Sequence, residues 1–143
     1  MIPKSILDAA KGFLCWDEFP DLSIQLIALQ DAVGYYYPQD NGLQSILLFY
    51  NPAVEDFTEA LFLLFHEAGH ACQWREMTAR KQGELFSRLM ALDTGQEKAA
   101  FECAAWRLGQ ELFEKFVKNH GLSTRLYDQF TEYGRRCSAS YIK

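Results

Sequence analysis

Residues 64–71 read LFHEAGHA and contain the pattern H-E-x-x-H, with His66, Glu67 and His70 at its fixed positions. Apolar side chains recur around this segment at the three- and four-residue intervals typical of a helix, which we predict over roughly 55–79. Residues four apart on a helix lie on one face, one turn apart. His66 and His70 are therefore predicted to present two imidazoles to one zinc ion.

The remaining parts of such a site are a base and a third ligand. Glu67 follows the first histidine, so it is the candidate general base that activates a zinc-bound water. A catalytic zinc site holds three protein ligands and one open position. We expect Glu102 as the third ligand, because Ala105 and Gly109 continue its helical face with small side chains that allow close packing. Glu97 is the alternative third ligand, or an acceptor that orients a histidine.

The chain before the motif predicts one helix and a small sheet. Apolar positions over 2–15 fit an amphipathic helix that closes near Gly12 or Trp16. Strands are expected near 22–29, 33–37 and 43–49, although 22–29 also fits a helix. The Asn41-Gly42 dipeptide is typical of the turn between two antiparallel strands. These features predict a small antiparallel sheet.

The chain after the motif is predicted to be helical. A short helix is expected from Gly83 to about 91, and a long helix then runs to about 119, with Thr94 and Glu97 spaced like a capping box. Ser123 is placed to cap a final helix. His120 lies beside Gly121 at a predicted helix end, where we expect it to interact with terminal carbonyls rather than with a metal. The fold class is α+β, in one domain over 1–143.

Composition restricts the classes of function. The chain has 143 residues, of which 49% are hydrophobic and 23% charged, a balance that excludes a disordered protein. Its net charge of −5 argues against a nucleic-acid partner. The N-terminus has no long apolar stretch, so we expect neither a secretory signal nor a membrane span, and a cytoplasmic location. The cysteines lie far apart and are expected to be buried and reduced.

The sequence resembles gluzincin metallopeptidases, especially the ImmA/IrrE-like peptidase group. The resemblance covers roughly 30–115 and rests on the H-E-x-x-H motif, on the strand-rich stretch over 34–48, and on Glu102-x-x-Ala105-Trp106-x-x-Gly109. It implies a minimal zincin-like domain, in which a sheet lies beside the active-site helix. It also implies a zinc metalloendopeptidase with one zinc per chain and a peptide or protein substrate along an edge strand, for which we expect 43–50.

Other interpretations of the motif stay open. The plainest is a helix with two half-buried histidines and an exposed glutamate. A second is a catalytically silent or latent zincin-fold domain that binds a peptide or partner protein. A third is a di-iron helical bundle, because Glu67-x-x-His70 matches one of its ligand pairs, but no second glutamate has a histidine three residues later. The seven tyrosines include candidate donors to an oxyanion, and the sequence selects none of them.

Overall fold

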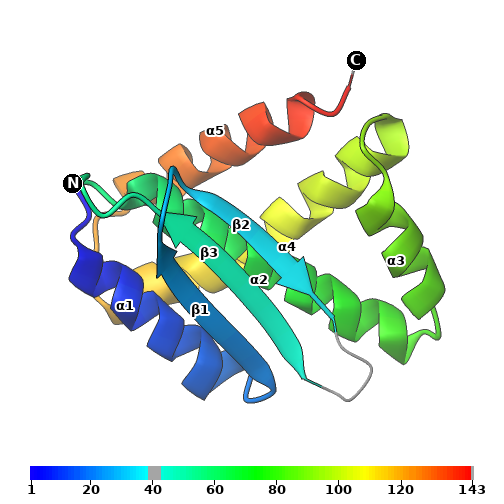
Figure 1. Ribbon diagram of the computed structural model, residues 1–143, viewed down its shortest axis with the longest axis horizontal. Coiled ribbons are helices and arrows are strands. Elements are labelled where there is room, and N and C mark those ends of the chain that lie inside the picture. Colours follow the sequence, from blue (N-terminus) through cyan, green and yellow to red (C-terminus); the bar gives the residue numbers. More distant parts are fainter. Residues whose placement is uncertain (39–42, 143) are drawn as a thin grey trace. The chain divides into compact units, whose positions relative to one another are not determined.

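The computed structural model describes residues 1–38 and 43–142 (Figure 1). In chain order its elements are α1 (Lys4–Gly12), the π-helix η1 (Phe13–Glu18), β1 (Leu22–Ala28), β2 (Val33–Tyr37), β3 (Gln44–Tyr50), α2 (Thr58–Ala79), α3 (Gly83–Ala91), α4 (Gln96–Asn119) and α5 (Arg125–Ala139). This content is α+β with a helical C-terminal half, so the predicted class is confirmed. The chain forms two compact units, Met1–Ala68 and Gly69–Lys143, and the division falls inside helix α2. One domain over 1–143 stays a prediction.

The first unit contains a three-stranded mixed sheet in the order β1-β3-β2 (Figure 1). β2 pairs with β3 antiparallel, but β1 pairs with β3 parallel, so the expectation of an entirely antiparallel sheet is wrong. β1 and β2 follow one another in the chain but do not pair, because they lie on opposite sides of β3. The central position of β3 also corrects the predicted substrate edge over 43–50, because the edges are β1 and β2. The predicted Asn41-Gly42 turn lies outside the described residues.

Apolar side chains from the sheet and from the helices α1, η1 and α2 form the core of the first unit. Ile46 and Leu48 alternate with less buried residues along β3, as expected for a strand that covers a core on one face. The rings of Phe13 in η1 and Phe65 in α2 lie 6.3 Å apart between centroids. Burying each such side chain contributes about 1.5–3 kcal/mol. This packing stabilises the N-terminal part of α2, which carries Glu67.

The helix ends of the first unit differ in detail from the prediction. Gly12 has helical angles, and the chain continues past it as a π-helix to Glu18, because Phe19 N–H bonds to Leu14 O at 2.8 Å. Helix α2 begins at Thr58, two residues after Asp56. The Asp56 carboxylate accepts hydrogen bonds from the Thr58 backbone N–H at 3.1 Å and hydroxyl at 2.6 Å, which satisfies polar groups at the helix start.

The second unit is helical. α4 and α5 pack through aromatic rings, with Phe113 stacked on Phe130 at 4.8 Å between centroids. The N-cap of α5 is Thr124 rather than the predicted Ser123, and it makes no side-chain cap hydrogen bond. The Ser123 hydroxyl nevertheless accepts the Arg125 N–H at 3.2 Å, at the first residue of the helix. The predicted capping box of Thr94 and Glu97 is wrong: Gly95, at φ 112°, is the N-cap of α4, and it has no side-chain cap hydrogen bond.

Two further expectations concern the whole chain. Among the described helices none is long and apolar enough to cross a membrane. All four cysteines are free, but none is buried: Cys103 is exposed and Cys15, Cys72 and Cys137 are intermediate. The expectation of buried thiols is therefore wrong, because these positions lie beside the core rather than in it.

Candidate metal centre

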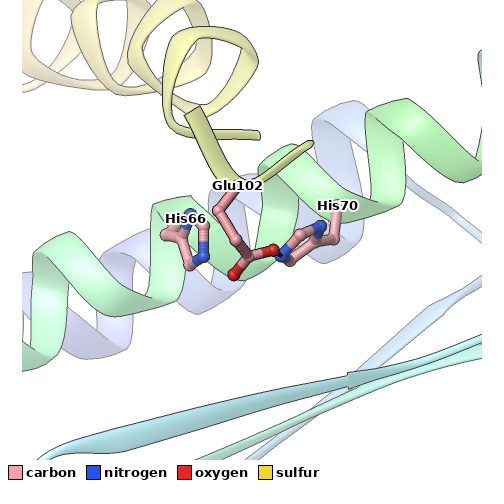
Figure 2. Close-up of side chains that lie close together, drawn as sticks. All are labelled: His66, His70 and Glu102. Atoms are coloured by element: carbon pink, nitrogen blue, oxygen red, sulfur yellow. Dashed lines mark ion pairs between the residues drawn. The ribbon is translucent and has the colours of Figure 1, made fainter. Parts of the chain in front are cut away.

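Three buried side chains form a group that can hold a metal ion. His66 and His70 lie one turn apart on α2, and Glu102 comes from α4 (Figure 2). Their exposed fractions are 5%, 1% and 5%, respectively. One ligand atom from each residue lies within 4.8 Å of the other two. The structure thus brings together the three residues that the sequence suggested as metal ligands.

The contact between α2 and α4 near Gly69 allows this approach. A Cβ atom on Gly69 would lie 1.9 Å from the carbonyl oxygen of Ala105 and 3.0 Å from the backbone nitrogen of Gly109. Real Cβ atoms do not approach backbone atoms so closely, so only glycine fits between these helices. The small residues of H-E-A-G-H and E-x-x-A-W-x-x-G therefore meet, and Glu102 reaches His70 because of this contact.

The Gln73 amide fixes the orientation of His70. Gln73 Nε2 donates to the carbonyl of Phe101 at 2.8 Å, and a carbonyl can only accept, so Gln73 Oε1 faces the imidazole. His70 Nδ1 lies 2.7 Å from that oxygen and must donate to it. The Phe101 ring stacks on His70 at 5.2 Å between centroids. His70 consequently directs Nε2 at the ligand group, as metal-binding histidines do when an acceptor holds the other ring nitrogen.

Glu102 contacts His70, Lys98 and Tyr141 within the second unit. Its Oε2 lies 2.9 Å from His70 Nε2 and 3.9 Å from Lys98 Nζ. Its Oε1 accepts a hydrogen bond from the Tyr141 hydroxyl at 3.1 Å. A carboxylate held at one oxygen by a neutral donor presents the other oxygen in a fixed direction.

Glu67 lies beside the ligand group without belonging to it. Its Oε2 is 4.0 Å from His66 Nε2, and the residue is buried. Strand β2 passes close to this side chain within the first unit, because a Cβ on Gly34 would lie 2.8 Å from Glu67 Cγ. The glycine therefore gives the Glu67 side chain the space that it occupies.

The alternative residues lie elsewhere. Glu97 has a side chain that is 66% exposed, with its Oε2 3.3 Å from Arg88 Nη2, and it is not a member of the ligand group. His120 is at the end of α4, where its Nδ1 is 3.1 Å from the Phe116 carbonyl, as expected from its position in the sequence.

Sequence reasoning missed four residues around the site. Gln73 and Lys98 had a readable signal, since they stand three residues after His70 and four before Glu102, within reach on one helix face. Gly34 had no local signal, because its role depends on a contact with α2. Tyr141 appeared only among seven tyrosines, and its partner lies 39 residues away in sequence.

Comparison of the chain with protein-family models, curated proteins and solved structures gives no match. The conclusion about function therefore rests on the chemistry of the site and not on similarity to known proteins. The protein has a buried His-His-Glu group that can hold a metal ion.

Proposed function

We propose that the protein is a zinc-dependent metalloendopeptidase, with His66, His70 and Glu102 as zinc ligands and Glu67 as general base. The observation that carries the proposal is the buried group whose ligand atoms lie within 4.8 Å of one another. It is supported by the Gln73 contact, which leaves the second nitrogen of His70 for the metal.

The donor set favours zinc over other common cations. Magnesium and calcium prefer shells made of oxygen atoms, whereas two imidazoles and one carboxylate suit zinc. Two histidines and one glutamate are a ligand set of catalytic zinc sites, which leave a fourth position for water or substrate. The hydrogen bond from His70 Nδ1 to Gln73 is the type of support that such ligands have.

The proposed chemistry assigns proton transfer to Glu67. Zinc, when bound, supplies a Lewis acid that polarises the peptide carbonyl and makes water easier to deprotonate. The Glu67 carboxylate takes the proton from the attacking water and delivers it to the departing amine. Its position 4.0 Å from His66 Nε2 suits a base that acts beside the metal rather than a ligand that binds it.

The proposed substrate is an extended peptide on strand β2. β2 lies at an edge of the sheet, and its Gly34 approaches Glu67 within the first unit. Peptides add to exposed strand edges through backbone hydrogen bonds, with alternate side chains on the two faces. Such binding needs no free peptide terminus, so it favours cleavage within a chain.

The test uses Glu67→Gln, which keeps the shape of the side chain but removes the base. We expect zinc content to stay at one ion per chain while hydrolysis of a quenched fluorescent peptide library falls about 100-fold or more. Glu59→Gln is the matched control, since Glu59 is an exposed residue of the same helix, and it should change neither quantity. Unchanged hydrolysis in Glu67→Gln contradicts the assigned base. Bound zinc without any hydrolysis by the wild type favours the silent, partner-binding domain instead.

A further inference from the structure

We propose that Tyr141 is a positioning residue for Glu102, so that zinc binding is coupled to the docking of residues 140–142 on the start of α4. The inference rests on the proposed function, because it concerns the affinity of the same site for zinc. All the contacts that carry it lie within the second unit.

Tyr141 is attached to α4 at two points. Its hydroxyl donates to Glu102 Oε1 at 3.1 Å, and its backbone carbonyl accepts the Gly95 N–H at 2.8 Å. Gly95 is the N-cap of α4, and Glu102 lies two turns further along the helix. A side chain and a backbone group of one residue thus span the first two turns of α4.

Lys98 links the end of α3 to Glu102 and Tyr141. Its ammonium group donates to the carbonyls of Leu89 at 3.2 Å and Met90 at 3.0 Å, at the end of α3. The same group lies 3.9 Å from Glu102 Oε2 and 5.7 Å from the centre of the Tyr141 ring. Lys98 is 6% exposed, so this charge is largely removed from water and acts on Glu102 with little screening.

These contacts give the two oxygens of Glu102 different partners. Tyr141 holds Oε1, and Oε2 faces His70 Nε2 at 2.9 Å. Oε2 is therefore the ligand oxygen, and the phenol keeps the carboxylate from rotating away from the histidine. Removing a hydrogen-bond partner of a metal ligand typically costs about 10- to 100-fold in metal affinity.

The first measurement is the zinc affinity of the full chain, determined by competition with a chromogenic chelator. Tyr141→Phe keeps the ring and removes the hydroxyl, and we expect zinc to bind about tenfold more weakly. Tyr127→Phe is the matched control, because it removes a hydroxyl that contacts the Glu114 carbonyl at 3.5 Å on the same helix pair. It should leave the zinc affinity unchanged. Equal affinities for Tyr141→Phe and wild type overturn the positioning role.

The second measurement needs no metal and reports docking directly. In metal-free protein, hydrogen exchange of the Gly95 amide should become faster in Tyr141→Phe and in Glu102→Gln, because either change weakens the docking of Tyr141, but not in Tyr127→Phe. If the wild type binds no zinc, the proposed function fails, and Gly95 exchange then decides the docking alone. Unchanged exchange in both site variants overturns the docking. Urea unfolding of each variant separates these effects from a general loss of stability.

Discussion

Each unit has one glycine at a close contact near the site, Gly69 within the H-E-A-G-H segment and Gly34 in β2, but the two glycines meet different partners. Gly69 in the second unit faces backbone, with the Ala105 carbonyl 1.9 Å from a would-be Cβ. Gly34 in the first unit faces the Glu67 side chain, at 2.8 Å from a would-be Cβ. A backbone contact cannot yield without moving a helix, whereas a side chain can turn aside. The second unit therefore fixes a ligand, and the first unit gives the proposed base its place.

The largest expected effect is that of Gly69→Ala. The added methyl group overlaps the Ala105 carbonyl, so α4 must move away from α2. We expect a loss of about 3 kcal/mol in the free energy of unfolding, together with loss of zinc binding. Urea unfolding and zinc titration measure the two effects. Gly12→Ala is the control, because Gly12 has helical angles and nothing lies within 4 Å of its added Cβ. A Gly69→Ala protein as stable as wild type would show that the contact is not needed.

Gln73→Leu is expected to weaken zinc binding without unfolding the chain. The change removes the acceptor that holds His70 Nδ1 and the donor to the Phe101 carbonyl. We expect about a 10- to 100-fold increase in the zinc dissociation constant. Isothermal titration with zinc measures it, and Gln110→Leu on α4 is a matched control. Equal dissociation constants for Gln73→Leu and wild type would mean that His70 needs no such support.

Gly34→Ala tests the role of the first unit. The methyl group displaces the Glu67 side chain, because the three atoms nearest to it all belong to Glu67, which is not a member of the ligand group. We expect peptide hydrolysis to fall about tenfold, from a misplaced base, while zinc affinity stays at the wild-type value. Steady-state kinetics and zinc titration on one preparation test this. A parallel loss of zinc and hydrolysis would show that the two units do not have separate roles.

The smallest expected effect is a pH dependence at the start of α2. Hydrogen bonds from the Thr58 hydroxyl and then from the Ile2 N–H lower the pKa of the Asp56 carboxyl below its usual 3.8. Its contribution to stability is therefore complete above that value and is lost as the pH falls through the lower folded pKa. Asp56→Ala should cost about 0.5–1 kcal/mol at pH 6, a small value because the group is largely exposed. The difference from wild type should shrink at pH 3 in urea unfolding, and a difference that grows would contradict the sign.

Much of the local structure could be predicted from the sequence, since helix and strand periods are local properties. The strand ranges, the motif helix and the long helix to Asn119 are confirmed. The order β1-β3-β2 could not be predicted, because strand order depends on packing against helices rather than on alternation within a strand.

The site, too, has residues that the sequence predicts and contacts that it does not. His66 and His70 follow from a four-residue spacing, and Glu102 could be suggested from the small residues that follow it on α4. The contacts of Tyr141 with Glu102 and of Gly34 with Glu67 join distant parts of the chain, at 39 residues for the first pair. No periodic pattern in the sequence predicts such contacts, so they could be identified only in the folded structure.

The central claim is tested most directly by the zinc content of the purified full chain after equilibration with zinc, measured by plasma mass spectrometry. The account predicts one zinc ion per wild-type chain, loss of that ion in Glu102→Gln, and retention in Glu97→Gln, whose side chain is exposed and pairs with Arg88. A wild-type protein without zinc, or a Glu102→Gln protein that holds zinc as tightly as wild type, would contradict it.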